Sequence, residues 1–213
     1  MSGLAADGGL FLPTSLPPKL NLESLVDLPF QERMIRIMED LLPSRIFDPI
    51  HLESIIDKER MIISSLVQKN LKMNTPKKAY SSFPPEGTPI VPLGNNCALA
   101  ELFHGPSASF KDFALQLFPH VLRGCQSGEV ITPTLICAAT SGDTGGALLA
   151  GLDSAQLEGM YGLVLMPADG TSKVQRDQML SFTHNPNIHV LEIDADFDFC
   201  QRFAFFVFPK FSF

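Results

Sequence analysis

The sequence has no tryptophan, two tyrosines and only four cysteines among its 213 residues. The cysteines lie far apart and form no C-x-x-C pair, so neither a metal site nor a disulfide framework is expected. We predict buried free thiols at these positions: Cys97, Cys125, Cys137 and Cys200. No apolar run approaches the roughly 20 residues that a membrane-spanning helix needs, so no membrane span is expected.

The chain also lacks an excess of positive charge. Its formal net charge is -7, whereas proteins that bind nucleic acid usually carry a basic face. Nucleic acid is therefore a poor candidate for the partner. The first residues, MSGLAADGGLFLP, have neither a basic leader nor a long apolar core, which disfavours a secretory signal and predicts a cytoplasmic protein.

Apolar sequence is plentiful enough for a core. Hydrophobic residues make up 45% of the chain and charged residues 18%, which suits one or two globular domains. Apolar residues at helix spacing over 31–42 and 48–66 predict a mainly helical N-terminal part, and prolines, lysines, serines and glycines over 70–94 predict a connector. The predicted regions are an N-terminal part with its connector (1–85), an α/β region (86–201) and a Phe-rich tail (202–213).

The α/β region is predicted from alternating strand and helix patterns. Four strands are expected, over 97–103, 134–140, 161–167 and 187–194. Three helices are expected between them, over 111–122 with a break or kink at Pro119, over 145–152 and over 172–180. Such alternation implies parallel strands with crossover helices, and ligands then bind at the carboxyl ends of the strands.

Lys111 lies in HGPSASFKDFALQLF, residues 104–118, where small turn-forming residues give way to a helix pattern. A cation is disfavoured in the first turn of a helix, where the backbone N–H groups carry partial positive charge. Burial between Phe110 and Phe113 would also favour the neutral amine. Because a neutral lysine is a nucleophile, the pattern predicts a catalytic amine.

The stretch ATSGDTGGA, residues 139–147, follows a predicted buried strand and opens a helix. Its backbone N–H groups and the hydroxyls of Thr140, Ser141 and Thr144 could converge on a carboxylate or phosphate. It matches neither a P-loop nor G-x-G-x-x-G, and a tight turn that needs glycine for close packing explains it equally well. If it binds an anion, a β-branched residue at Gly145 should reduce binding more than stability.

A nucleophilic lysine and an anion site on the next strand together suggest a Schiff base to a cofactor aldehyde. GLAADGGLFLP, ELFHGPSASFKDFALQL, TSGDTGGA, and QRDQM followed by HVLEIDADFDFCQ resemble successive signatures of the threonine synthase family, with the vertebrate threonine synthase-like proteins closest. The resemblance covers about residues 3–201. It implies an α/β fold that is an incomplete fold type II pyridoxal-phosphate enzyme, preceded by the small helical N-terminal part.

The resemblance also implies roles for individual residues. Lys111 matches the lysine that holds pyridoxal 5'-phosphate and serves as catalytic acid and base, and Asp143 stands where related enzymes often have an asparagine near the cofactor's ring hydroxyl. Substrate binding is implied for Ser141, Gly142, Thr144 and Gly145, and for Lys173 and Arg176 at the substrate phosphate. A solvated helix face explains the last two cations equally well. His104 could face the cofactor, although a lone histidine is more often structural.

The tail, RFAFFVFPKFSF, holds six of the 17 phenylalanines and resembles nothing in the family. Family members continue with a glycine-rich loop for the cofactor phosphate and a partner for the pyridine nitrogen. The resemblance therefore implies a truncated variant with an alternative C-terminus and weakened cofactor binding. The window FAFFVF has high strand propensity and predicts self-association or a protein partner.

Two functions are open from the sequence. The first is a pyridoxal-phosphate-dependent phospho-lyase that eliminates phosphate from a small phosphorylated hydroxy amino acid, O-phosphothreonine or O-phosphohomoserine, and is impaired in the truncated form. The second is a non-enzymatic truncated variant that acts as a cytokine-like signalling or binding protein, secreted by an unconventional route, whose exposed aromatic surface meets its partner.

Overall fold

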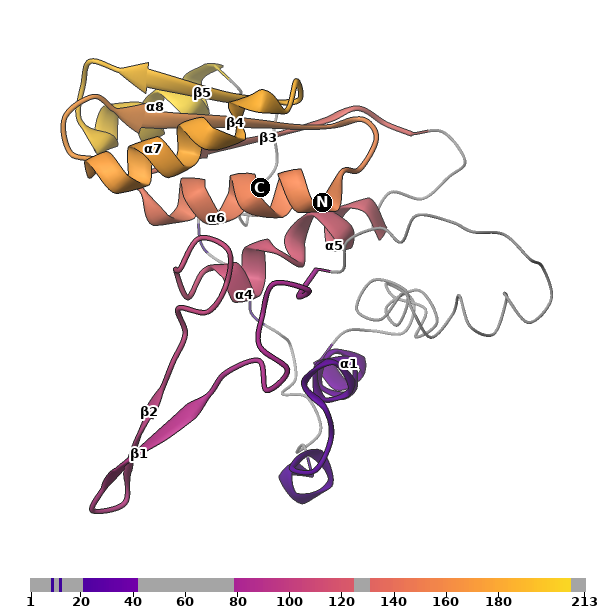
Figure 1. Ribbon diagram of the computed structural model, residues 1–213. Helices are drawn as coiled ribbons and strands as arrows, with labels where there is room; N and C mark the ends of the chain where they lie inside the picture. The colour runs from indigo at the N-terminus through magenta and orange to yellow at the C-terminus, as the bar shows by residue number, and fades with distance from the viewer. Residues whose placement is uncertain (1–8, 10–11, 13–20, 42–78, 125–130, 208–213) are drawn as a thin grey trace.

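The computed structural model describes Gly9, Leu12 and residues 21–41, 79–124 and 131–207 (Figure 1). The helix predicted over 48–66, residues 70–78 of the predicted connector, Cys125 and residues 208–213 lie outside this part. The described residues form an α/β fold with a parallel sheet, as predicted. Among the described helices, none combines the length and the apolar character that a membrane span requires.

The N-terminal part consists of a short 3-10 helix, η1 (Leu22–Leu25), and the helix α1 (Phe30–Leu41). Arg33 in α1 donates from Nε to the carbonyl of Leu25 at 3.1 Å and from Nη2 to the carbonyl of Leu28 at 3.0 Å. Leu25 is the last residue of η1, and Leu28 lies in the turn that leads into α1. The two bonds therefore fix the turn between the two helices.

Four aromatic rings join α1 to the helix that follows Lys111, which is α4 (Asp112–Leu115). Phe30, Tyr80, Phe83 and Phe113 pack edge to face, with ring centroids between 4.9 and 6.4 Å apart. The Tyr80 hydroxyl donates to the carbonyl of Phe113 at 2.6 Å, and burial raises the pKa of Tyr80 well above its ordinary value. The aromatic cluster thus holds α4 from one side.

The predicted helix over 111–122 is broken into α4 and α5 (Phe118–Gly124). The break precedes Pro119, which is buried in the first turn of α5. Proline is tolerated there because the first N–H groups of a helix have no intrahelical acceptor. The break at Pro119 is therefore confirmed.

A β-hairpin occupies the end of the predicted connector. β1 (Ile90–Gly94) pairs antiparallel with β2 (Cys97–Ala100), and Asn95 and Asn96 between them have φ values of 50° and 59°. Two-residue hairpin turns of the primed types need such positive φ values, which asparagine tolerates. The strand predicted over 97–103 is therefore shorter than expected and lies outside the parallel sheet. The connector predicted over 70–94 is wrong over its last five residues, because they form β1.

The parallel sheet contains β3 (Thr134–Ala139), β4 (Met160–Pro167) and β5 (Ile188–Ile193), in that order. α6 (Asp143–Ala155) and α7 (Lys173–Ser181) are the crossover helices, and a 3-10 turn, η2 (Phe182–His184), follows α7. These strands and helices confirm the predictions for the region beyond residue 130. Ala139 is the register partner of Leu165, and Pro167 of Ile193, so the carboxyl ends of the three strands lie at one edge.

The sheet is covered on both faces (Figure 1). Along β4, Val164 and Met166 pack on the face that also buries Leu149 of α6 and Met179 of α7. Leu165 points to the opposite face and packs against the last helix, α8 (Phe197–Val207). Alternate residues of a strand face opposite sides, so β4 is buried by helices on both sides, as expected for a parallel strand.

Helix α8 runs through the position where the tail was predicted to begin. The Asp196 carboxylate caps its start by accepting a hydrogen bond from the N–H of Phe199 at 2.7 Å. Cys200 and Ala204, one turn apart, are buried against the sheet. The strand propensity of FAFFVF is therefore overridden in residues 203–207, because capping and burial of one helix face outweigh a local preference.

The outer side of α8 carries exposed aromatic rings. Phe199 stacks on Phe203 with centroids 6.1 Å apart, and Phe206 is 82% exposed. An aromatic face of this kind suits self-association or a protein partner, which stays a prediction.

The cysteines differ in their surroundings. Cys137 and Cys200 are free thiols within the fold, and burial raises the pKa of each above its ordinary value. Cys97 is also free but lies exposed on β2, so the prediction that it is buried is wrong. All nine strand residues of the hairpin that carries it, β1 and β2, are exposed.

Candidate functional site

The candidate site lies at the carboxyl edge of the parallel sheet, where β3 leads into α6 and β4 leads into α7. Three side chains from different elements meet there. The Lys111 Nζ atom is 3.8 Å from Asp143 Oδ2, and Gln175 Nε2 donates to Asp143 Oδ1 at 2.7 Å. The edge predicted to bind a ligand therefore does gather polar groups.

Lys111 is the N-cap residue of α4, directly before the helix begins. Its side chain is 34% exposed, and Nζ lies 5.4 Å from the centroid of the Phe110 ring. Burial between two phenylalanines is not observed, because Phe113 turns into the aromatic cluster and Phe110 is exposed. The carboxylate of Asp143 and the face of Phe110 are instead contacts that suit a cation. Lys111 thus stands directly before a helix, as the sequence predicts, but the prediction that two phenylalanines bury it is wrong.

Asp112, next to Lys111, organises the loop that precedes the helix. Its carboxylate is fully buried and accepts three hydrogen bonds, from the N–H and hydroxyl of Ser107 at 2.9 and 2.8 Å and from Gln116 Nε2 at 3.1 Å. The N–H of Lys111 donates to the Ser109 hydroxyl at 3.3 Å. Sequence reasoning missed Asp112, although an aspartate in the first turn of a helix is a recognisable signal.

The loop between β3 and α6 is held by Thr140. The Thr140 hydroxyl is buried and accepts hydrogen bonds from the N–H groups of Gly142 and Gly145, each at 3.0 Å. Two of the N–H groups assigned to an anion from the sequence are therefore bonded within the protein. Fewer backbone N–H groups are therefore available to an anion than predicted.

What remains of this loop can still meet a ligand. Ser141 is exposed, and Thr144 is partly buried in the first turn of α6. Within the described ranges, the N–H groups of Asp143 and Thr144 make no hydrogen bond. Unpaired N–H groups at the start of a long helix favour an anion, so these two groups and the two hydroxyls keep the predicted role chemically sound.

The glycines of the loop serve close packing. Gly142 has φ 150°, and a Cβ there would overlap the carboxamide of Gln175. A Cβ on Gly145 would lie 2.6 Å from both Met179 Sδ and Thr140 Cγ2. A larger residue at Gly145 should therefore reduce stability as well as binding, which revises the expectation from the sequence.

Gln175 was missed in the sequence, although it stands in a recognisable pattern. Ser172 is the N-cap of α7 and accepts the N–H of Gln175 at 3.3 Å, and the Ser172 hydroxyl bonds Gln175 Oε1 at 2.8 Å. Serine at the N-cap with glutamine three residues later is a capping box. The box is local, but the contact to Asp143 spans 32 residues and could not be seen in the sequence.

Lys173 and Arg176 each pair with a carboxylate other than that of Asp143. Lys173 is 87% exposed and pairs with Asp177 at 2.5 Å, and Arg176 pairs with Glu192 of β5 at 2.5 Å. These contacts agree with the solvated helix face that the sequence left open. Binding of a substrate phosphate by either residue stays a prediction.

His104 has a structural partner. Its Nε2 atom lies 2.7 Å from Glu101 Oε2, and its ring stacks on Phe103 with centroids 4.6 Å apart. These contacts suit the structural role that the sequence favoured for a lone histidine.

Thr171 lies in the loop between β4 and α7, one residue before the capping serine. Its hydroxyl oxygen is buried and has no hydrogen-bond partner within the described part of the chain. An unsatisfied buried hydroxyl is costly, and a bound ligand is one way to satisfy it. Sequence reasoning did not select this residue.

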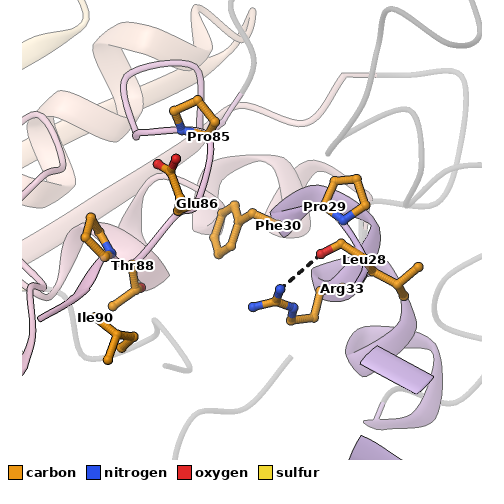
Figure 2. A pocket seen from close by; sticks show the side chains of 9 residues that line it. Leu28, Pro29, Phe30, Arg33, Pro85, Glu86, Thr88 and Ile90 are labelled. Atoms are coloured by element: carbon orange, nitrogen blue, oxygen red, sulfur yellow. Dashed lines mark hydrogen bonds between the residues drawn. The ribbon is translucent and has the colours of Figure 1, made fainter. Parts of the chain in front are cut away.

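A hollow of about 470 Å³ lies elsewhere, between α1 and residues 85–90 (Figure 2). Phe30, Pro85 and Ile90 line it together with Arg33, whose guanidinium donates to the carbonyl of Leu28. Lys111, Asp143 and Gln175 are not among its lining residues. The hollow is thus separate from the candidate site, and the arginine beside it is already engaged.

Comparison with known proteins gives a consistent result. A family model described as "Threonine synthase N terminus" matches residues 1–59. The chain is 31% identical over 211 residues to threonine synthase of Schizosaccharomyces pombe, covering 94% of this chain and 37% of that protein. It is 32% identical over 213 residues to threonine synthase-like 1 of Homo sapiens, covering 94% of this chain and 25% of that protein.

A solved structure agrees with these relatives. The crystal structure of pyridoxal-phosphate-bound threonine synthase from Brucella melitensis matches with a TM-score of 0.69 and 30% identity, over 98% of this chain and 40% of that one. This match confirms the predicted fold class. The chain spans less than half the length of each of these relatives. The comparisons support the threonine synthase family and lend no support to a secreted signalling protein.

Proposed function

From this support for the threonine synthase family, we propose that the chain forms the lysine side of a pyridoxal-phosphate site in a phospho-lyase. The observation that carries the proposal is the position of Lys111. It lies at the N-cap of α4 beside the carboxyl edge of the sheet, with Nζ 3.8 Å from a carboxylate oxygen. It also stands in the stretch SFKD, through which the sequence resembles the family.

The residues present fit the cofactor. Lys111 is exposed enough for its amine to meet an aldehyde, and the hydroxyl of Thr171 is buried without a partner in the described ranges. When bound, pyridoxal phosphate supplies an electron sink for a carbanion next to the substrate amine. In our proposal Lys111 holds the cofactor and then moves a proton at Nζ, while Asp143 keeps a carboxylate beside that atom.

We propose O-phosphothreonine or O-phosphohomoserine as the substrate, with release of a keto acid. The Ser141 and Thr144 hydroxyls and the N–H groups of Asp143 and Thr144 would bind its carboxylate. Lys173 or Arg176 would bind its phosphate only by leaving Asp177 or Glu192.

We further propose that the chain is related to the vertebrate threonine synthase-like proteins and that its 213 residues alone turn over substrate slowly. It spans 37% of the yeast synthase, so a large part of that protein has no counterpart in these 213 residues. Charge-assisted bonds to a cofactor phosphate carry much of the binding energy, and their loss lowers affinity. Slow phosphate release from O-phosphothreonine, relative to a full-length relative, is the expected outcome.

Labelling with the cofactor tests the assignment of Lys111. We expect borohydride reduction of the chain mixed with pyridoxal phosphate to fix the label on Lys111, because this amine lies at the predicted site. Peptide mass spectrometry identifies the labelled lysine. Lys111→Ala should lose the label and Lys173→Ala should keep it. A label that appears on Lys77, Lys78 or Lys173 and spares Lys111 would contradict the proposal.

A further inference from the structure

Gln175 is the residue through which α7 reaches the candidate site. Its Nε2 atom donates to Asp143 Oδ1 at 2.7 Å, while its Oε1 atom bonds the Ser172 hydroxyl at 2.8 Å. Both ends of the carboxamide are therefore engaged. The neighbouring cations on α7, Lys173 and Arg176, are paired with Asp177 and Glu192 and make no ion pair with Asp143.

The carboxamide of Gln175 is also held in place by packing. It lies against the Cα atom of Gly142, so closely that a Cβ at that position would overlap it. Gly142 is buried and is the N-cap of α6, directly before Asp143. The amide group that donates to Asp143 is thus fixed by hydrogen bonds at both ends and by the backbone of α6 along its side.

The geometry divides the Asp143 carboxylate between two partners. Oδ1 accepts the short hydrogen bond from Gln175, whereas Oδ2 lies 3.8 Å from Lys111 Nζ. A hydrogen-bonded pair between an ammonium and a carboxylate is shorter, about 2.7–2.9 Å. Asp143 is half-exposed on its side-chain surface, so sterics alone do not hold it away from the lysine. The hydrogen bond from Gln175 is the contact that restrains the Asp143 carboxylate.

We propose that Gln175 is a positioning residue that withholds Asp143 from Lys111 and so keeps the lysine amine free to react. Without the amide donor, the carboxylate would have Lys111 as its nearest hydrogen-bonding partner and would close on it. A closed ion pair holds the lysine proton and blocks attack on an electrophile. This role rests on the proposed function, because the cofactor aldehyde is the electrophile that Lys111 would meet.

A purely structural role for Gln175 is the alternative, since the same contacts join the starts of α6 and α7. The two roles differ in their dependence on charge. A structural link should affect stability whether or not residue 143 carries a carboxylate. A positioning role should disappear when Asp143 becomes asparagine, because a neutral amide does not form an ion pair with Lys111.

The test measures the reactivity of Lys111 in the chain without cofactor. Wild type, Gln175→Met, Asp143→Asn and the double variant are treated briefly with an amine-acetylating reagent at one pH. The labelling of Lys111 relative to Lys173 is read by peptide mass spectrometry. Gln175→Met keeps the length of the side chain and removes both amide hydrogen bonds. Gln178→Met, one turn further along α7, is the matched control.

We expect Gln175→Met to slow the labelling of Lys111 about threefold, the effect of an ion pair near the upper end for partly exposed charges. Gln178→Met should leave it unchanged, and Gln175→Met should have no effect in the Asp143→Asn background. Unchanged labelling in Gln175→Met, or equal slowing with and without the Asp143 carboxylate, would overturn the inference. Urea unfolding of each variant shows that the comparison is made on folded protein.

This outcome is separable from that of the proposed function. Acetylation needs no cofactor, so the role of Gln175 can fail while pyridoxal phosphate still labels Lys111. Conversely, the cofactor can fail to label Lys111 while Gln175 still controls its reactivity.

Discussion

Replacing Asp112 with alanine is expected to lower the free energy of unfolding by about 3 kcal/mol or more, since hydrogen bonds to a charged group contribute about 1.5–3 kcal/mol each. The carboxylate is fully buried and accepts three such bonds. Gln116 would keep its second bond, to the carbonyl of Ala147 at 3.1 Å. The N–H and hydroxyl of Ser107 would lose the bonds that they make to Asp112, and they would have to find water.

Urea denaturation followed by circular dichroism measures this effect. Asp169→Ala is the matched control, because Asp169 is an exposed aspartate in the loop after β4. Exposed substitutions usually stay within about 0.5 kcal/mol of wild type. If Asp112→Ala were no less stable than Asp169→Ala, the three hydrogen bonds would not contribute as the structure indicates.

Asp112→Ala should also change the position of Lys111 under conditions where the chain still folds. Gly105 lies so close to the Asp112 side chain that a Cβ on it would be 2.5 Å from Asp112 Cβ. The loop before Lys111 is thus wrapped around this carboxylate. Loss of the carboxylate frees the loop, and the preorganised position of the lysine is lost with it.

The parallel sheet could be predicted because its signals are local. β4 is an apolar run between Gly159 and its last residue, Pro167, and β3 has the same character, whereas β5 carries His189 and Glu192 among its apolar residues. Such runs identify buried parallel strands. The hairpin turn at Asn95 and Asn96 was equally local, since two asparagines between short strands favour positive φ, but this signal was overlooked.

The features that were missed depend on contacts between distant residues. Helix α8 forms over a sequence of high strand propensity because Cys200 and Ala204 are buried on β3 and β4, more than 30 residues earlier in the chain. The local pattern predicts a helix that starts after Lys111, but whether Phe113 shields the lysine depends on Phe30 and Tyr80, which hold the Phe113 ring and carbonyl. The partner of Asp143 was hidden for the same reason, since Gln175 belongs to the next crossover helix.

Gly151 of α6 lies at the contact between α6 and α4, the helix that follows Lys111. α6 packs on α4 at Gly151, where an added Cβ would overlap the backbone carbonyl of Leu115. A backbone carbonyl cannot move aside as a side chain can, so α4 itself would have to shift. α4 begins directly after Lys111 and is held on its other side by the aromatic cluster. A change at Gly151 therefore acts on the lysine through the whole short helix.

Gly151→Ala is accordingly expected to lower the free energy of unfolding by about 1–3 kcal/mol, the usual cost of overpacking a close contact. Gly146→Ala, in the same helix, is the matched control. The nearest atom to its Cβ would be Gln178 Oε1 at 2.9 Å, the movable end of a side chain, so helix propensity should dominate and stabilise by up to about 1 kcal/mol.

Both variants are compared by urea denaturation and by borohydride trapping of pyridoxal phosphate. Gly151→Ala should also reduce the label on Lys111 under conditions where the variant is still folded, because displacement of α4 moves the amine out of the predicted cofactor site. Gly146→Ala should keep it. Equal stability of the two variants would mean that α4 and α6 do not pack as closely as the structure indicates. Destabilisation of Gly151→Ala with an unchanged label on Lys111 would show instead that the position of the lysine is set by the Asp112 loop and not by the contact between the helices.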